Sequence, residues 1–233
     1  MTYQETIDCL YDLADAEKVT FREKKFGIKS RNALGISHKE LKVVAREIGL
    51  NNDLAVQLFD SGIYEGRLLC SKLFNPKDLT ELLMEKWIST FENWEICDSF
   101  SMGLFAKSNL AIPKINEWTK RKPEFQKRAG FATMAAFCLA DKESDNAIFE
   151  AFFAIIKREA HDPRLYVKKA VNWALRSIGK RNVDLKESAI KVARKILTYE
   201  STAAKWIARA ALKELEKEDV RISDYPRALY RIH

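Results

Sequence analysis

The sequence predicts an all-α protein, an α-solenoid in which antiparallel helical pairs stack on one another. The chain has 233 residues, of which 47% are hydrophobic, and this is enough for a sizeable core. Only 8 Gly and 5 Pro occur, which leaves little turn chemistry for an all-β fold. Apolar residues recur at helical spacing in many short segments with short connections, as expected of stacked helical pairs.

The first half of the chain contains a clear helix start. Ser37 and Glu40 form a capping box, apolar residues follow at helical spacing, and Gly49 marks the end of that helix. The other helices that we expect in this half cover residues 3–15, 18–26, 52–60, 63–73, 77–88 and 93–107.

The second half continues the same pattern. The expected helices cover residues 112–120, 124–140, 145–158, 163–180, 185–197 and 201–216. Pro113, Pro123 and Pro163 each fall at or just before a helix start, where proline is tolerated. No strict sequence repeat occurs, so any repeats are degenerate. We expect one domain over residues 1–218 and a C-terminal tail over residues 219–233.

Composition argues against several other classes of protein. The four cysteines are scattered without a CxxC pair, which is typical of reduced thiols in a cytoplasmic protein. With only three histidines, we expect neither a metal site nor a cofactor. No run of about 18 apolar residues predicts a transmembrane helix. The polar and acidic N-terminus is unlike a signal peptide.

The net charge of +7 is concentrated in one region. Between Asp162 and Lys213 there are 13 lysines and arginines against 4 acidic residues, a net of +9. The segments before and after this region each have a net charge of −1. A field of this kind steers polyanions, and nucleic acid is the first candidate partner. A solvated helical surface would give the same count.

The segment NWEICDSFSMGLF, residues 93–105, places a carboxylate one helical turn from a large ring. On a helical wheel, the core stripe consists of Ile96, Cys97, Phe100 and Leu104. The wheel puts Trp94, Asp98, Ser101 and Phe105 on a separate face. This second face suits a cleft, and it equally suits packing against a neighbouring helical pair with Asp98 as a cap or ion-pair partner.

The segment YVKKAVNWALRSIGKR, residues 166–181, has a similar division. Its core stripe consists of Val167, Val171, Ala174, Leu175 and Ile178. Trp173 shares the other face with Lys169, Arg176 and Lys180. A ring among cations suits a phosphodiester chain, whose phosphates meet the cations and whose sugar or base meets the ring. A tryptophan half-buried under lysine and arginine stems fits the pattern as well.

Arg128 is the last charged residue before Asp141 in a helix that is otherwise uncharged and closely packed. An arginine in such a place is often a bidentate anchor for a phosphate or a carboxylate. A structural ion pair is the simpler interpretation.

Several motifs together resemble one known family. The segments NWEICD (93–98), KRAGFA (127–132) and VKKAVNWALRSIGKRN (167–182) look like those of the AlkD-like DNA alkylation-repair glycosylases. The earlier stretch 34–49 is similar to that family's N-terminal segment, and the resemblance runs in order from about Lys25 to Leu215. It implies a superhelix of HEAT-like helical pairs with a basic concave DNA-binding face.

The resemblance also implies an activity and a set of site residues. The family hydrolyses the N-glycosidic bond of N3- and N7-alkylated purines in duplex DNA, is known for working without base flipping, and is expected here to cleave no strand. By resemblance, the catalytic residues are Asp98, Trp94 and Trp173. The DNA-binding residues expected from the resemblance and from the charge pattern are Arg128, Lys168, Lys169, Arg176, Lys180, Arg181 and Phe26.

One departure from the family concerns Phe26. The family's type members carry a tyrosine on an N-terminal helix facing the lesion, whereas residues 18–35 contain no tyrosine. We expect Phe26 in that place, with Phe21 as the other aromatic candidate.

The expected partner is double-stranded DNA that contains alkylated bases, bound by a monomer without a metal or a membrane. The expected location is the cytoplasm, with the protein on the nucleoid when it is bound to DNA. Two other functions stay open at this point. One is a non-catalytic HEAT-like protein that binds damaged or branched DNA, and the other is a protein–protein scaffold, a common role of α-solenoids.

Overall fold

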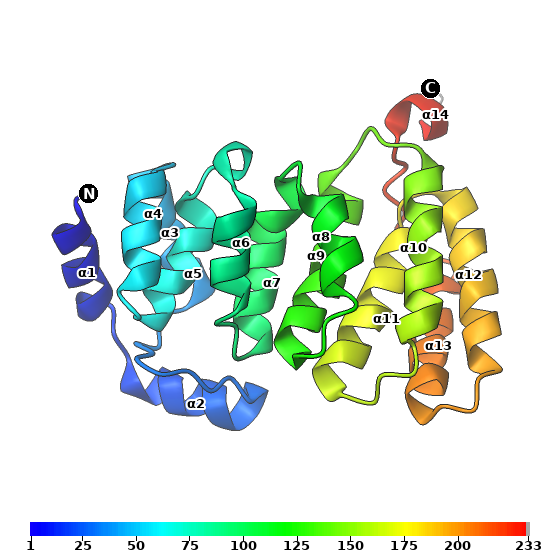
Figure 1. The fold of residues 1–233 in the computed structure, drawn as a ribbon, viewed down its shortest axis with the longest axis horizontal. Helices are drawn as coiled ribbons and strands as arrows, with labels where there is room; N and C mark the ends of the chain where they lie inside the picture. The colour runs from blue at the N-terminus through cyan, green and yellow to red at the C-terminus, as the bar shows by residue number, and fades with distance from the viewer. Residues whose placement is uncertain (232–233) are drawn as a thin grey trace. The chain divides into compact units, whose positions relative to one another are not determined.

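A computed structural model describes residues 1–231, and its regular structure in that range is entirely helical, which confirms the all-α prediction (Figure 1). Ile232 and His233, the end of the predicted tail, lie outside the described residues. The chain divides into two compact units, one over Met1–Ser108 and one from Asn109 onward. None of the helices within residues 1–231 has both the length and the apolar character that a membrane span requires.

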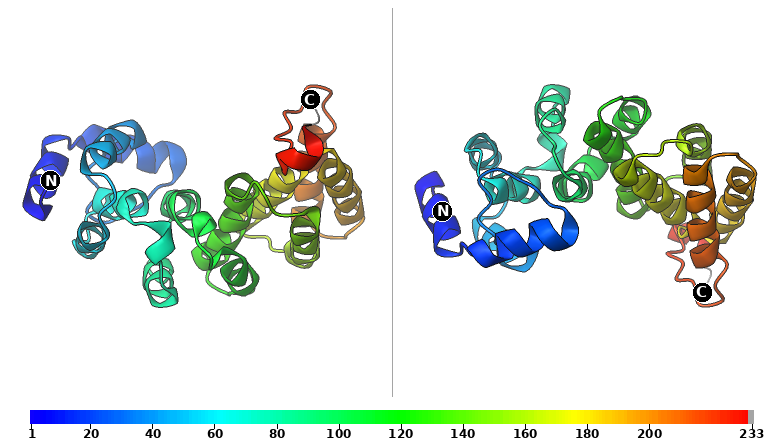
Figure 2. Two further views of the ribbon diagram at one scale, coloured as in Figure 1. Left: turned by 90° about the horizontal axis from the view of Figure 1, so that it is seen from above. Right: turned by 90° about the horizontal axis from the view of Figure 1, so that it is seen from below.

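The first unit consists of seven α-helices and two 3₁₀ turns within the described chain. They are α1 (Tyr3–Asp12), α2 (Ala16–Phe26), α3 (His38–Ile48), α4 (Asn52–Asp60), α5 (Tyr64–Leu73), η1 (Pro76–Asp78), α6 (Glu81–Ile88), α7 (Trp94–Gly103) and η2 (Phe105–Lys107). Helices α4 and α5 form an antiparallel pair, and α5 packs on both α3 and α7. Helix α2 lies across one end of α3, α4 and α5 (Figures 1 and 2).

The core of the first unit is built around Phe100. Its ring centroid lies 5.2 Å from that of Phe91, 5.4 Å from that of Trp87 and 5.5 Å from that of Phe105. Close approach of backbones completes this packing. A Cβ atom on Gly66 would lie 2.8 Å from the carbonyl oxygen of Leu58, so only glycine allows α5 to approach α4 this closely.

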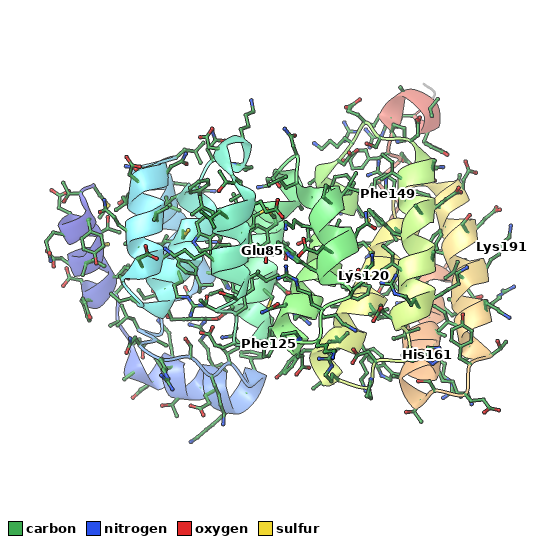
Figure 3. The ribbon with its side chains drawn as sticks, in the orientation of Figure 1. Glu85, Lys120, Phe125, Phe149, His161 and Lys191 are labelled. Atoms are coloured by element: carbon green, nitrogen blue, oxygen red, sulfur yellow. The ribbon has the colours of Figure 1, made fainter. Side chains whose placement is uncertain are left out.

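The second unit contains seven further helices among the described residues. They are α8 (Ala111–Trp118), α9 (Glu124–Ala140), α10 (Asn146–Glu159), α11 (Leu165–Gly179), α12 (Val183–Leu197), α13 (Thr202–Leu215) and α14 (Arg227–Tyr230). The pairs α8–α9, α10–α11 and α12–α13 are in contact, and α11 packs between α9 and α13. The buried Phe149 of α10, labelled in Figure 3, contacts the rings of Phe137 and Phe152.

The predicted helix start at Ser37 and both core stripes are confirmed, whereas the helix predicted over residues 77–88 begins only at Glu81, after the separate turn η1. Ser37 Oγ accepts a hydrogen bond from the Glu40 amide, Glu40 Oε2 accepts one from the Ser37 amide, and the helix ends at Gly49 with φ of 74°. Both predicted core stripes are completely buried. These features depend on residues three or four positions apart, so they can be predicted directly from the sequence.

The predicted helix over residues 93–107 is wrong in its last turn. Helix α7 ends at Gly103, and residues 105–107 form the separate turn η2. The helical wheel therefore does not extend to Phe105, which is buried against Phe91 and Phe100 instead of sharing a face with Trp94. Ser101 is buried as well.

Candidate functional site

Trp94 and Asp98 lie one turn apart at the start of α7, and both are half-buried. Helix α7 begins here because Asn93 is its N-cap. The Asn93 side-chain oxygen accepts hydrogen bonds from the amides of Glu95, at 2.9 Å, and Ile96, at 3.1 Å. The cap therefore determines where the first turn starts, and with it the direction in which Trp94 and Asp98 project.

Phe26, the last residue of α2, lies beside this turn. The indole Nε1 of Trp94 donates a hydrogen bond of 3.0 Å to the carbonyl oxygen of Phe26. The Phe26 side chain is 44% exposed, and its ring meets that of Phe21 edge to face at 5.9 Å. An aromatic side chain without a hydroxyl group is thus held next to Trp94.

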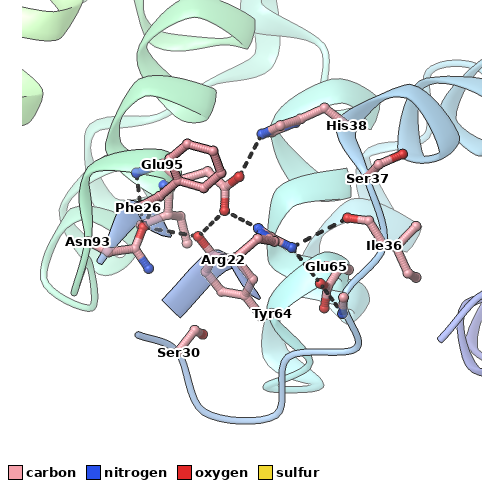
Figure 4. A network of polar contacts seen from close by, with 12 residues as sticks. Arg22, Phe26, Ser30, Ile36, Ser37, His38, Tyr64, Glu65, Asn93 and Glu95 are labelled. Carbon is pink, nitrogen blue, oxygen red and sulfur yellow. Dashed lines mark hydrogen bonds and ion pairs between the residues drawn. The ribbon is translucent and has the colours of Figure 1, made fainter. Parts of the chain in front are cut away.

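A buried polar network centred on Glu95 connects α2, α3, α5 and α7 (Figure 4). The carboxylate of Glu95 accepts an ionic hydrogen bond from Arg22 Nη2, and His38 Nε2 lies 3.0 Å from its Oε1 atom. The Tyr64 hydroxyl lies 2.8 Å from Glu95 Oε2 and 3.0 Å from Asn93 Oδ1. The network joins the residue beside Trp94 to the helix that ends at Phe26.

A second buried carboxylate, Glu65, holds the loop that follows α2. It accepts hydrogen bonds from the amides of Leu34, at 2.8 Å, and Gly35, at 2.9 Å, and its Oε1 atom lies 3.3 Å from Arg22 Nη1. Arg22 therefore bridges Glu65 and Glu95 (Figure 4). The end of α2 is positioned relative to α7 by charge-assisted hydrogen bonds, which are about twice as strong as neutral ones.

We expect Glu95→Gln to lower the free energy of unfolding by about 3 kcal/mol at pH 7, because it leaves the Arg22 charge with a poorer partner. Burial raises the pKa of the Glu95 carboxyl, but hydrogen bonding to His38 and the charge of Arg22 outweigh burial, and the net shift is downward. A lowered pKa in the folded state means that the stabilisation is complete above the pKa of an unfolded glutamate, about 4.3. It disappears as the pH falls through the folded-state pKa.

Urea unfolding of the wild type and of Glu95→Gln between pH 7 and pH 3 tests this. The difference between their free energies of unfolding should shrink as the pH falls. Glu47→Gln, which alters an exposed carboxylate on α3, is the control and should follow the wild type. A difference that is constant over the whole pH range would contradict the assignment.

In the second unit, α11 carries Trp173 with its predicted cationic neighbours. Trp173 is half-buried and Lys169 is exposed. Arg176 and Lys180 both pair with Glu214 of α13; the Lys180 Nζ–Glu214 Oε1 distance is 2.7 Å. Burial raises the pKa of Glu214, but the two cations overcome it and lower the pKa overall. Glu214 thus neutralises part of the charge that the sequence pattern suggests for this face.

Arg128 is only 6% exposed, and its Nη1 atom donates a 2.8 Å hydrogen bond to the carbonyl oxygen of Tyr166. The Tyr166 amide in turn donates to Glu124 Oε1 at 3.2 Å. Both contacts join the start of α9 to the first turn of α11. That turn carries Lys168 and is followed directly by Lys169, so Arg128 helps to position both.

The prediction that Arg181 contacts DNA is corrected by its surroundings. The Arg181 side chain is 0% exposed, and its guanidinium donates to the carbonyl oxygens of Cys138, Asp141 and Ser144. It also lies 3.7 Å above the ring of Phe149. Burial lowers the pKa of this guanidinium, which nevertheless stays charged at neutral pH. Arg181 joins α9, α10 and α11 and presents no surface to a phosphate.

One exposed aromatic residue that the sequence reasoning missed is Trp206 of α13. It is 39% exposed, and Lys168 Nζ lies 5.3 Å from its ring centroid. Arg209 and Lys213 follow at helical spacing and line a shallow depression with Trp206. The same signal that singled out Trp173, a tryptophan with cations three and seven residues later, was available here.

Residues 7–215 match a family model described as "DNA alkylation repair enzyme". A comparison with curated proteins found no match.

Two solved structures match this chain. One is described as "a new family of proteins related to the HEAT-like repeat DNA glycosylases with affinity for branched DNA structures". It is 18% identical, covers 95% of this chain and 97% of its own, and has a TM-score of 0.76, which confirms the HEAT-like fold. The other, a designed armadillo repeat protein, is 13% identical over 76% of this chain and 92% of its own, with a TM-score of 0.35.

Proposed function

Because the chain belongs to the family of DNA alkylation repair enzymes, we propose that it hydrolyses the N-glycosidic bond of cationic N3- and N7-alkylated purines in duplex DNA. The observation that carries this proposal is the half-buried Asp98, one helical turn from Trp94 at the capped start of α7. We further propose that the enzyme acts as a monomer on the DNA of the cytoplasm, cleaves no strand, flips no base, and needs no metal or cofactor.

The proposed role of Asp98 follows from the charge of the substrate. An alkylated purine is already cationic, so it leaves as a neutral base without further protonation. As the C1′–N bond breaks, positive charge moves to the sugar, as in glycoside hydrolysis. A fixed carboxylate stabilises that charge and accepts a hydrogen bond from the water that attacks C1′. Water supplies the new C1′–O bond, and its proton passes to the carboxylate and then to solvent.

Aromatic and cationic residues complete the proposal. The face of Trp94 favours an electron-poor sugar through a cation–π effect. Trp173, which belongs to the second unit, is proposed as the other tryptophan that contacts the DNA. Phe26 offers a third ring, which is held in place by the Trp94–Phe26 hydrogen bond. Lys168, Lys169, Arg176 and Lys180 neutralise backbone phosphates, so binding should weaken as the salt concentration rises. Arg128 acts by positioning the first turn of α11.

The proposal is tested by incubating the purified protein with a duplex that carries one N7-methylguanine, and a second that carries N3-methyladenine. We expect release of the free base, measured by chromatography, and an abasic strand that breaks only after alkali treatment. An undamaged duplex of the same sequence is the control. No release from either lesion would overturn the proposal.

A non-catalytic DNA-binding protein is the second candidate, and Phe26 favours it. The family's type members carry a tyrosine there, and Phe26 lacks that hydroxyl. The similar solved structure is described as having affinity for branched DNA. On this alternative, Asp98→Asn would bind DNA as tightly as the wild type or more tightly, because a negative charge near phosphate is removed, and no base would be released.

A further inference from the structure

The second unit contains a cavity of about 440 Å³ between α11 and the segment that follows α13. Helix α11 contributes Trp173 and Lys180 to its lining. The C-terminal segment, residues 219–231, contributes Arg221, Tyr225, Arg227 and Arg231. Two aromatic rings and four cations thus line a single cavity, although the sequence suggests only a C-terminal tail at this end.

The C-terminal segment is fixed to the end of α11 by backbone hydrogen bonds. The Ser223 amide donates to the carbonyl oxygen of Lys180, and the Tyr225 amide donates to that of Arg181, both at 2.9 Å. The side-chain amide of Asn182, the N-cap of α12, donates to the Tyr225 carbonyl oxygen at 2.7 Å. The C-terminal segment is therefore an ordered part of this unit and forms one wall of the cavity.

The charge of the cavity is positive and largely uncompensated. Arg221, Arg227 and Arg231 are exposed, and no carboxylate oxygen of residues 1–231 lies within 4 Å of their guanidinium groups. Lys180 shares Glu214 with Arg176, so it contributes less. Three exposed arginines without a carboxylate partner, next to aromatic rings, form a surface that suits a phosphate joined to a flat or sugar-like group.

We propose that this cavity binds one phosphodiester unit of a DNA strand. The phosphate would meet Arg221 and Arg227, and its sugar or base would meet Trp173. A cavity of this size lies in the range of small-ligand sites, roughly 300–1,000 Å³, and holds one nucleotide unit but not a base pair. The three arginines lie beyond residues 7–215, the part matched by the family model. The inference rests on the proposed function only in taking DNA as the ligand.

The test compares two double variants that each remove two positive charges from exposed residues of the second unit. Arg221→Gln with Arg227→Gln alters the cavity, and Lys191→Gln with Lys195→Gln alters the exposed face of α12. Affinity for a labelled undamaged duplex, and for a single strand of the same sequence, is measured by fluorescence anisotropy at several salt concentrations. Thermal unfolding checks that both variants fold.

The cavity variant should bind on the order of tenfold more weakly, and the slope of log affinity against log salt should fall by about 1, because both arginines meet the same phosphate. The loss of affinity of the α12 variant should be less than half that of the cavity variant. A greater loss with the single strand identifies an unpaired strand as the source of the phosphodiester, and an equal or greater loss with the duplex identifies the duplex backbone.

Equal behaviour of the two double variants would overturn the proposal, since it would mean that only total charge matters. So would a cavity variant that binds like the wild type, or a wild type that binds neither DNA. If the cavity double variant fails to fold, Arg231→Gln is compared with Lys191→Gln. Arg231→Gln must then weaken DNA binding more than Lys191→Gln does. Undamaged DNA keeps this test independent of base release, so a binding protein without glycosylase activity would fail the earlier test and still pass this one.

Discussion

We expect Asp98→Asn to lower the rate of base release by on the order of a thousandfold. A carboxylate about 4 Å from a unit positive charge, at an effective dielectric constant of about 20, contributes roughly 4 kcal/mol. Each 1.36 kcal/mol of lost transition-state stabilisation slows a reaction about tenfold. Asparagine keeps the size and shape of the side chain and removes its negative charge.

The measurement is a single-turnover assay at saturating enzyme on a duplex with one N7-methylguanine, so that binding does not limit the rate. Asp60→Asn is the matched control because it alters a carboxylate of the same unit that pairs with Lys86. The control should keep the wild-type rate. If Asp98→Asn keeps a third or more of the rate while the wild type is active, Asp98 is not the essential carboxylate.

Arg181→Met should lower the free energy of unfolding by about 4 kcal/mol, a large share of the stability of a small protein. The substitution leaves the carbonyl oxygens of Cys138, Asp141 and Ser144 without their buried donor. It also removes the contact between the guanidinium and the ring of Phe149. The methionine fills a similar volume, so the loss reflects missing hydrogen bonds more than an empty cavity.

Urea unfolding at pH 7 measures this effect. Arg181→Lys keeps a positive charge but cannot reach three carbonyl groups with a rigid planar fork, so its loss should be intermediate. Arg194→Met alters an exposed arginine of α12 and should be close to the wild type. An Arg181→Met protein within about 1 kcal/mol of the wild type would show that the buried contacts of Arg181 contribute little.

Local sequence patterns predicted the helices, their core stripes and the start of α3 because each of these depends on residues within one or two turns. The Ser37–Glu40 capping box is complete within four residues. The pairing of Trp94 with Asp98 follows in the same way from a spacing of four residues. The family resemblance added the chemistry that such a pair could perform.

The contacts that surround the candidate site are not visible in the sequence. The partners of Glu95, which are Arg22, His38 and Tyr64, are 73, 57 and 31 positions away in the chain. Spacing along one helix carries no information about such contacts. The network that joins the end of α2 to α7 became visible only when these segments were brought together.

Lys180 and Arg181, which are neighbours in the chain, show most clearly what the sequence determines and what tertiary structure decides. In the sequence they are adjacent cations at the end of a basic helix, and both are expected to contact DNA. In the folded unit, Lys180 lines a cavity with the C-terminal segment, whereas Arg181 is enclosed by α9 and α10. Hydrophobic periodicity determined which side of α11 is core. Contacts between segments that are distant in the chain decide which cations are buried. They also decide whether the last residues form one wall of the cavity, and only tertiary packing brings these segments together.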